Sequence, residues 1–500
     1  MGGSADAVVV GSGPNGLAAA VTLAAAGLQV LVIEGAATWG GGCRTEALTL
    51  PGFLHDVCAA VHPLVLASPF FRRFDLPGRG VRLLQPEVVF AHPLDGGRAA
   101  VVRRSVAATA AGLGPDGDAY LRLHRPLAQD GLTIADWVLS VRRRPPGRPL
   151  ALARYGLNGV RSATTVAERF ATEEARALFA GVAAHSARPL DTAPTAGIGL
   201  LLSALAHRVG WPVVAGGSGR LSQAMADAVV GAGGAVETGR WVRSLRELPK
   251  ARALLLDVTP RGLLDLAGGR LPSRYRRRLE RFRYGSGVCK VDFALAGPVP
   301  WTNEGCRRSG TLHLGGTLEE VAAAEAAVAA GRHPDRPYVL AVQPGVVDPD
   351  RAPSGQHTLW TYCHVPRGSG VDMTAPIEAQ VERFAPGFRD LVLARARRTA
   401  RDQERHNPNC VGGDIGAGLL DLRQTFFRPG LAWNPHRTPL RGVYLCSAST
   451  VPGPGVHGRC GELAALTALR DVFGLRGATS LEPVGGRPGP GTAPSDGPHA

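Results

Sequence analysis

The first 34 residues hold the feature that most constrains the fold, which is two short apolar segments separated by a glycine-rich turn and a helical stretch. Residues 5–10 form an apolar run typical of a buried parallel strand. Residues 17–26 are mostly alanine and leucine, which are strong helix formers, and Gly27 supplies a helix stop. Residues 29–33 are a second β-branched strand. This order predicts a βαβ unit of Rossmann type.

The turn between the first strand and the helix matches the pattern G-x-G-x-x-G. Glycine makes up 66 of 500 residues, so the pattern gains its weight only from lying between a strand and a helix. The first glycine permits the tight turn, the second lets the backbone approach a pyrophosphate, and the third lets the helix pack on the strand. The helix N-terminus then offers free N–H groups to the phosphates. The predicted site residues are Gly11, Ser12, Gly13, Pro14, Asn15 and Gly16.

Two further features indicate which dinucleotide binds. Glu34 ends the second strand, where an acidic side chain accepts hydrogen bonds from ribose hydroxyls and its charge disfavours the 2′-phosphate of NADP. A second glycine-rich turn follows a few residues later, and simple NAD dehydrogenases seldom need one. Flavoproteins of the amine oxidase and phytoene desaturase type carry such a turn, with an arginine that meets the cofactor. The sequence therefore favours FAD, with Gly41, Gly42, Arg44 and Thr45 as additional contacts.

Several further segments carry recognisable motifs. They are residues 8–76, with the motifs PGFLHDVC at 51–58 and HPL at 62–64, the turn GGSG at 216–219, and the stretch 445–461 that begins LCSAS. Through these segments the sequence resembles the phytoene desaturase-related flavoprotein family, and within it most resembles the branch called pyridine nucleotide-disulphide oxidoreductase domain-containing protein 2. The resemblance covers nearly the whole chain up to about residue 475, and its two ends are more specific than its middle.

The resemblance implies an α/β protein, α+β overall, with a Rossmann-type FAD-binding domain assembled from separated segments and a mixed sheet and helical substrate domain. The implied FAD-binding domain comprises residues 1–74, 206–288 and 416–475, and the substrate domain residues 75–205 and 289–415. Val242, placed in a strand after the Gly233–Gly234 turn, matches a family position at the adenine end, and Gly455 and Val456 match the segment beside the flavin pyrimidine.

The physical chemistry of the last segment agrees with that assignment. Residues 453–458 form another G-x-G-x-x-G between a strand and a helix, but no second βαβ unit or acidic residue follows. A helix N-terminus at this place would put positive potential beside the flavin N1/O2 edge and stabilise the anionic reduced form. The remaining expected elements are helices over residues 167–184, 222–231, 317–330 and 462–473, and strands over residues 235–242, 254–258, 285–300 and 442–447.

The flavin would supply the redox chemistry, so the sequence identifies no certain acid or base. His62 and His457 are weak catalytic candidates as proton shuttles, since both fall in segments expected near the flavin, as does His55. Structural hydrogen bonding is the commoner role for such histidines. Cys43 and Cys58 are 15 residues apart and no C-x-x-C occurs, so we expect reduced thiols, neither a redox disulfide nor a metal site.

Composition bears on whether the protein binds nucleic acid or a membrane. The formal charge of +15 would suit nucleic acid, but only Lys250 and Lys290 are lysines, and this skew towards scattered arginine reflects composition, not a nucleic-acid groove. We find no run of about 18 apolar residues and no signal peptide, so we expect a cytoplasmic protein without a membrane span, with peripheral membrane contact left open. Residues 476–500 are rich in proline, glycine and serine and are expected to be a disordered tail.

The sequence thus predicts an FAD-dependent oxidoreductase of the dehydrogenase or desaturase type that removes a hydride from a hydrophobic or amphipathic small molecule. Two alternatives stay open, namely a flavin-binding regulator or scaffold with little turnover, and an NAD-binding dehydrogenase without flavin. The sequence does not determine the substrate, the electron acceptor or the oligomeric state.

Overall fold

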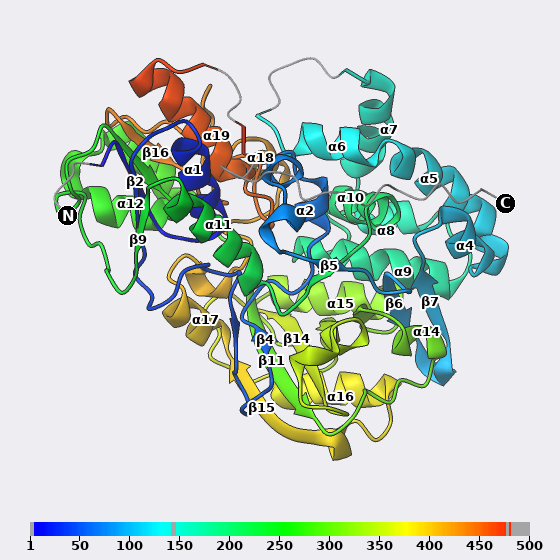
Figure 1. Cartoon of the computed structure of the whole chain (residues 1–500). Helices are drawn as coiled ribbons and strands as arrows, with labels where there is room; N and C mark the ends of the chain where they lie inside the picture. Colours follow the sequence, from blue (N-terminus) through cyan, green and yellow to red (C-terminus); the bar gives the residue numbers. More distant parts are fainter. Residues whose placement is uncertain (1–4, 142–146, 477–479, 482–500) are drawn as a thin grey trace, which may run out of the picture.

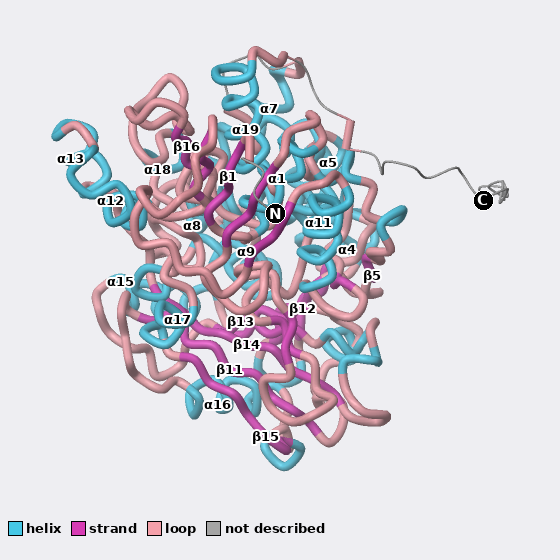
Figure 2. The backbone as a smooth tube through the Cα atoms, turned by 60° about the vertical axis from the view of Figure 1, so that its left-hand side comes forward, coloured by secondary structure: helices cyan, strands magenta, loops and turns pink. Residues whose placement is uncertain are grey.

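Two β-sheets and the helices that cover them make up the fold. The computed structural model describes residues 5–141, 147–476 and 480–481. A five-stranded sheet lies in one half of the molecule and a seven-stranded sheet in the other, as the two views agree (Figures 1 and 2). The start, middle and end of the chain, coloured blue, green and red in Figure 1, meet around the five-stranded sheet. The predicted α/β class with a Rossmann-type unit is confirmed.

The five-stranded sheet is entirely parallel and is covered on both faces. Its strands, in the order β16-β10-β1-β2-β9, are β16 (Val443–Leu445), β10 (Ala253–Leu256), β1 (Ala7–Val10), β2 (Val30–Ile33) and β9 (Ala235–Glu237). Helices α1 (Pro14–Ala24), α11 (Gly219–Gly231) and α19 (Arg459–Ala468) pack on one face, and α12 (Pro260–Ala267) and α13 (Ser273–Glu280) on the other. Along β1, Ala7 and Val9 face the first group and Val8 and Val10 the second, as expected for a strand buried on both sides.

Helix α1 can lie against β1 and α19 only because two glycines lack a side chain. A Cβ on Gly16 would lie 2.0 Å from the carbonyl oxygen of Gly11, and a Cβ on Gly461 would lie 1.8 Å from the carbonyl oxygen of Asn15. The C-terminal helix therefore packs directly on the backbone of the N-terminal turn.

The seven-stranded sheet is antiparallel except for one parallel pair, β12 with β6. In the order β15-β11-β14-β13-β12-β6-β7, its strands are β15 (Val392–Arg398), β11 (Gly287–Leu295), β14 (His357–Val365), β13 (Val339–Val342), β12 (Thr311–Leu314), β6 (Phe90–Pro93) and β7 (Ala99–Val102). Side chains alternate along β14, so that Trp360 and Tyr362 belong to the core on one face and Leu359 and Cys363 to the core on the other.

Helices cover both faces of this second sheet. The face that carries Trp360 is covered by α4 (Val106–Ala111), α5 (Gly117–Gln129), α6 (Gly131–Val138), α7 (Pro149–Gly159), α8 (Ala163–Ala167), α9 (Glu173–Ala183), α10 (Thr195–Arg208) and α15 (Leu318–Ala329). The opposite face is covered by α14 (Glu304–Arg307), α16 (Thr374–Phe384) and α17 (Ala400–His406). The remaining elements are the short α2 (Pro63–Ala67), α3 (Phe71–Phe74) and α18 (Leu422–Phe426), and the two-stranded pairs of β3 (Thr45–Glu46) with β4 (His55–Asp56) and β5 (Leu83–Leu84) with β8 (Val213–Val214).

Several predicted element boundaries are wrong. Helix α1 begins at Pro14, not at residue 17, because proline at the first helical position already has a helical φ. The strand predicted over residues 235–242 ends at Glu237, shortly before Gly239 adopts a φ of +70°, so Val242 lies in a loop. The helix predicted over residues 167–184 is split, since α8 ends at Ala167 and α9 begins after its N-cap Thr172.

The other boundaries differ less. Strand β11 is shorter than the predicted 285–300, and α19 starts three residues before the predicted 462 and ends at Ala468, where a π-helical turn follows to Phe473. Of the predicted disordered tail, residues 477–479 and 482–500 lie outside the described residues. Leu481 is buried against the core of the five-stranded sheet, and its carbonyl accepts a hydrogen bond of 2.7 Å from Arg79.

The predicted boundaries of the FAD-binding domain and of the substrate domain stay predictions. All five parallel strands come from residues inside 1–74, 206–288 and 416–475. Among the helices of the described part of the chain, none has both the length and the apolar character that crossing a bilayer requires.

We expect Gly461→Ala to lower the free energy of unfolding by about 2–4 kcal/mol, because the added Cβ meets the carbonyl oxygen of Asn15 and must push α19 away from α1. Urea unfolding followed by circular dichroism measures this. Gly231→Ala is the matched control, since a Cβ there meets nothing within 4 Å and alanine is the better helix former. Equal destabilisation by the two changes would contradict the close approach.

Candidate functional site

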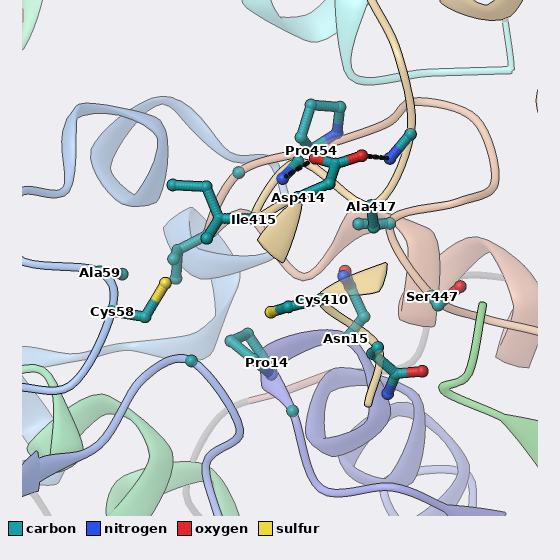
Figure 3. A pocket seen from close by; sticks show the side chains of 18 of the residues that line it. Pro14, Asn15, Cys58, Ala59, Cys410, Asp414, Ile415, Ala417, Ser447 and Pro454 are labelled. Atoms are coloured by element: carbon teal, nitrogen blue, oxygen red, sulfur yellow. Dashed lines mark hydrogen bonds between the residues drawn. The ribbon is translucent and has the colours of Figure 1, made fainter. Parts of the chain in front are cut away.

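A large cavity of about 1030 Å³ runs between the two sheets. One end is formed by the loops at the carboxyl ends of β1, β2 and β10, which is where ligands bind in open α/β sheets. The other end lies on the face of the seven-stranded sheet beneath helices α6, α7 and α10. Figure 3 looks into the cavity, with Pro14 and Asn15 on one side and Asp414, Ala417 and Pro454 on another.

The first glycine-rich turn lines the dinucleotide end through part of its predicted residues. Gly11, Gly13, Pro14 and Asn15 are on the cavity wall, whereas Ser12 and Gly16 lie behind it. Gly11 has a φ of +94°, a conformation that favours glycine. A Cβ on Gly13 would lie 2.7 Å from Oδ2 of Asp257. The turn is therefore a bare backbone cradle of the kind that a pyrophosphate needs.

Glu34 lies on the cavity wall at the end of β2, and its carboxylate is held by the first turn. Its Oε2 accepts hydrogen bonds from the backbone N–H of Ser12, at 2.8 Å, and from the Ser12 hydroxyl, at 2.6 Å. Its Oε1 accepts a hydrogen bond of 2.8 Å from the N–H of Ala36. A carboxylate has about four lone-pair sites, so this fixed group can still accept a hydrogen bond from a ribose hydroxyl.

Asp257, at the end of β10, is a residue that the sequence analysis missed. Its Oδ2 accepts a hydrogen bond of 2.9 Å from the N–H of Gly16, in the first turn of α1. Burial is the largest influence on this carboxyl and raises its pKa to about 7, the Gly16 hydrogen bond lowers it, and the charge of Glu34 adds to the increase. A titratable acid thus lies directly beneath the turn, and no local motif signals it because its partner is 241 residues away.

The second glycine-rich turn stacks on the first. Gly41 has a φ of +55°, and a Cβ there would lie 2.9 Å from the Cα of Gly13. The N–H of Gly40 donates to the carbonyl of Ser12 at 3.0 Å. Gly41 and Gly42 line the cavity. The two turns therefore form one wall in which neither can carry a side chain at the point of contact.

Arg44 lines the cavity, while Thr45 lies off its wall. Arg44 donates from Nε to the carbonyl of Gly41 at 3.0 Å, and its Nη2 lies 2.7 Å from Nε2 of His406. The Thr45 hydroxyl donates to Asp56 at 2.8 Å and accepts from the N–H of Gly219 at 3.0 Å. Thr45 therefore links two loops through its hydroxyl, and its contact with the cofactor stays a prediction.

The C-terminal segment also lines the cavity, while its contact with the flavin pyrimidine stays a prediction. Pro454, Gly455 and Val456 line it. Gly455 has a φ of +117°, and a Cβ there would lie 2.3 Å from a methyl of Leu64. Val242 and its neighbour Trp241 also line the cavity, from the loop beyond β9 and not from a strand.

The two histidines predicted as weak catalytic candidates differ in position. His457 is fully buried off the cavity wall, and both its ring nitrogens are engaged, Nε2 with the carbonyl of Gly453 and Nδ1 with the N–H of Arg459. Burial lowers its pKa to about 4. His62 lines the cavity and bonds the Ser218 hydroxyl at 2.8 Å, and burial also lowers its pKa to about 4. Of the two, only His62 lines the cavity, and the proton-shuttle role stays a prediction for both.

A buried cationic group flanks the second turn and was not predicted. Lys290 on β11 is 3% exposed, pairs with Asp292, and lies 5.5 Å from the ring centroid of Trp360. Arg398 is its register partner on β15. Burial lowers the pKa of His406 to about 4, with further lowering by Arg398. In the sequence Lys290 looks like the outward residue of a half-buried strand, and only the packing of the two sheets reveals that it is buried.

Thiol chemistry finds no support at the cavity. All eight cysteines are free, and among those on the wall are Cys58 and Cys410 (Figure 3). Burial is the largest influence on both and raises the pKa of each thiol. A raised pKa keeps a thiol protonated and poorly nucleophilic.

The inner end of the cavity is a compartment lined mainly by apolar and aromatic side chains. Its floor is one face of the seven-stranded sheet, and its roof comes from α6, α7 and α10 with their adjoining loops. The residues of the floor are Val288, Leu340, Trp360, Tyr362 and His364, and those of the roof include Trp137, Val138, Leu139, Leu152, Tyr155, Ile198, Leu201 and Leu202.

Comparison with known proteins shows what the chain is similar to. A family model described as an NAD(P)-binding Rossmann-like domain matches residues 9–74. Pyridine nucleotide-disulfide oxidoreductase domain-containing protein 2 from Rattus norvegicus is 26% identical, and that from Mus musculus 27%, each over 93% of this chain and 94% of the relative. The resemblance that the sequence analysis stated is therefore confirmed.

Solved structures share the fold at low identity. An oxidoreductase from Methanosarcina mazei is 17% identical over 92% of this chain and 99% of its own, with a TM-score of 0.60. Putrescine oxidase bound to putrescine is 17% identical over 94% and 98%, with a TM-score of 0.57. Cyclohexylamine oxidase from Brevibacterium oxydans is 18% identical over 94% and 100%, with a TM-score of 0.56. The chain thus shares its overall fold with these proteins.

We expect Asp257→Asn to stabilise the protein at pH 8 but not at pH 4. The folded pKa of about 7 lies above the ordinary value of 3.8, so the unfolded chain releases this proton first as the pH rises. The wild-type free energy of unfolding therefore loses this contribution between about pH 4 and pH 7. Asparagine keeps an acceptor for the Gly16 N–H without the charge, and we expect a gain on the order of 2–4 kcal/mol at pH 8.

Urea unfolding at the two pH values measures this difference. Asp335→Asn, at an exposed loop position, is the control and should leave the pH profile unchanged. A stability difference between wild type and Asp257→Asn that is the same at pH 4 and pH 8 would contradict the raised pKa.

Proposed function

We propose that this protein is an FAD-dependent oxidoreductase that removes a hydride from a hydrophobic or amphipathic small molecule bound in the inner compartment. The observation that carries the proposal is that one cavity joins a dinucleotide cradle to an apolar compartment. Its volume of about 1030 Å³ is at the upper end of ordinary ligand pockets, which supports a cofactor together with a second molecule.

The cradle supports FAD over a nicotinamide dinucleotide. The residues that would hold the pyrophosphate and ribose are those of the first turn and Glu34, whose charge disfavours a 2′-phosphate. The second turn continues this wall, since Gly41 contacts Gly13, and the C-terminal Gly455–Val456 segment adds a further wall. A cofactor with a large ring system would use these additional surfaces, whereas an isolated NAD site has no need of them.

The surroundings of the second turn support a redox role. Bound FAD supplies a two-electron acceptor that takes a hydride from carbon. Arg44 lies on the wall at this end of the cavity, and the half-buried Arg398 and the buried Lys290, which is paired with Asp292, are neighbours on β15 and β11. Positive charge favours the added negative charge of a reduced flavin. The apolar roof from α6, α7 and α10 excludes water from a bound substrate.

The resemblance to the phytoene desaturase-related family supports a dehydrogenase or desaturase type of reaction. The direct test is the visible absorption of the purified protein. We expect the spectrum of an oxidised flavin, and its bleaching when substrates are added without oxygen. If no flavin co-purifies and added FAD does not bind, the proposal fails. If flavin binds but no fraction of a metabolite extract reduces it, the protein is instead a flavin-binding regulator.

A substitution in the first turn tests the cradle itself. We expect Gly13→Val to weaken FAD binding by at least about 100-fold, because the side chain displaces the backbone that would hold the pyrophosphate. Flavin fluorescence measures the Kd, and circular dichroism checks that the variant folds. Gly231→Ala should bind FAD as the wild type does, since its Cβ meets nothing. Unchanged affinity in a folded Gly13→Val protein would place the cofactor elsewhere.

A further inference from the structure

We propose that His364 and Glu325 form the proton-accepting group of the inner compartment, and that this pair selects a substrate carrying a hydroxyl group on the carbon to be oxidised. The inference rests on the proposed function for the identity of the hydride acceptor, but the pair itself is a property of the chain.

The geometry places a carboxylate directly behind a histidine on the cavity floor. His364 lies on β14 and lines the cavity, and Glu325 lies on α15, which packs on the same sheet. The two side chains are 3% and 2% exposed, and Nδ1 of His364 is 2.8 Å from Oε1 of Glu325. The other oxygen of Glu325, Oε2, is buried and has no hydrogen-bond partner among the described residues. His364 is therefore the hydrogen-bond partner of the Glu325 carboxylate.

This contact determines which nitrogen of His364 can react. A carboxylate accepts and cannot donate, so it holds the proton of His364 on Nδ1. The lone pair is then on Nε2, the ring nitrogen left for the cavity. A carboxylate behind Nδ1 also stabilises the imidazolium that forms when Nε2 takes a proton.

The neighbours of the pair are aromatic or neutral. Tyr338 stacks on His364 with ring centroids 5.7 Å apart, and Tyr362 lies at 5.5 Å. On the side of helix α9, His185 belongs to the short 3-10 helix Ala184–Ser186, and burial, with a contribution from His364, lowers its pKa to about 3. Among the described residues no lysine, arginine or further carboxylate is hydrogen-bonded or ion-paired to His364, so Glu325 is the charged group in direct contact with it.

The lining beside the pair favours an alcohol over an amine. The charges farther along the cavity are of both signs, since Arg44 shares its wall with Glu34 and Asp414, so they do not decide between the two. In the inner compartment an ammonium would leave water for a mainly apolar and aromatic lining, where the carboxylate beside the site is already engaged by His364. A neutral hydroxyl can instead donate its hydrogen bond to Nε2. The solved neighbours named after amines share only the fold with this chain.

The step balances with the proposed cofactor. The O–H bond of the alcohol breaks and its proton forms an N–H bond at Nε2 of His364. The electron pair left on oxygen forms the C=O bond, while the C–H bond breaks and its pair leaves as a hydride to the oxidised flavin. The alcohol is oxidised by two electrons to a carbonyl compound, and the imidazolium is held by Glu325.

His185 provides a matched control on the same cavity wall. It also lines the cavity, but its Nε2 lies 2.9 Å from Nε2 of His313, and no carboxylate among the described residues is hydrogen-bonded to it. His185→Gln therefore changes the lining and keeps both partners of the hydrogen bond between His364 and Glu325. Glu325→Gln keeps the shape of the carboxylate but removes its charge.

The first test determines which ring nitrogen of His364 carries the proton, by nitrogen NMR of the full-length protein labelled with ¹⁵N-histidine. The signal of His364 is the one lost in His364→Gln and retained in His185→Gln. We expect the tautomer with the proton on Nδ1 and the lone pair on Nε2. In Glu325→Gln this tautomer preference should be lost. A neutral ring with its proton on Nε2, or an unchanged preference in Glu325→Gln, would overturn the proposal.

The second test measures the binding of three matched probes by tryptophan fluorescence, since Trp137, Trp211 and Trp360 line the cavity. We expect the wild type to bind 2-naphthalenemethanol roughly three- to tenfold more tightly than its methyl ether and than 2-naphthylmethylamine. His364→Gln should abolish the preference for the alcohol and His185→Gln should retain it. Equal binding of the three probes by the wild type, tighter binding of the amine, or no binding of the alcohol would overturn the proposal.

Neither test depends on flavin reduction, so the two proposals can fail separately. An alcohol preference in a protein that binds no flavin would support the pair and contradict the proposed cofactor. A flavoprotein whose flavin is reduced, but whose His364 shows neither the tautomer nor the preference, would contradict the pair alone.

Discussion

The close approach of three backbones at Gly16 and Gly461 is the constraint on which the candidate site depends. Gly16 brings the first turn of α1 against Gly11, and Gly461 brings α19 against the same turn through Asn15. A side chain at either position would separate the elements by more than an ångström, and packed interiors have no room to absorb that. The glycine-rich wall of the cavity is therefore built from both ends of the chain at once, and the Gly455–Val456 wall follows from the position of α19.

A second constraint holds the two sheets at the separation that leaves the cavity between them. Arg351 is fully buried and donates to Asp56 at 3.0 Å and to Asp348 at 2.8 Å. Asp56 also accepts from the N–H of Ser218, and Asp348 from that of Gly216. These charges are paired and hydrogen-bonded, as buried charges must be. The network joins the hairpin after the second turn, the loop before α11 and a loop of the seven-stranded sheet domain.

Local elements were predictable because their causes are local. The βαβ unit, the two glycine-rich turns and Glu34 each follow from residues within a few positions of one another, and the structure has Gly13, Gly41, Arg44 and Glu34 on one wall. The position of Thr45 and the burial of His457 were not predictable, because each depends on loops from distant segments. The sequence predicts Val242 in a strand, but that strand ends at Glu237 and Gly239, with a positive φ, turns the chain before Val242.

The residues that give the cavity its chemical character come from contacts distant in sequence. Asp257 meets the first turn because β10 lies beside β1, and Lys290 is buried because the second sheet packs against the loops of the first. His364 and Glu325 are 39 residues apart on a strand and a helix, and no spacing pattern joins them. The sequence by itself determined the Rossmann-type βαβ unit and where its glycine-rich turns lie, because backbone conformation at glycine and helix termini is a local property. Only the tertiary structure decided which buried acids, bases and aromatic rings surround it, because burial and pairing arise from packing between distant segments.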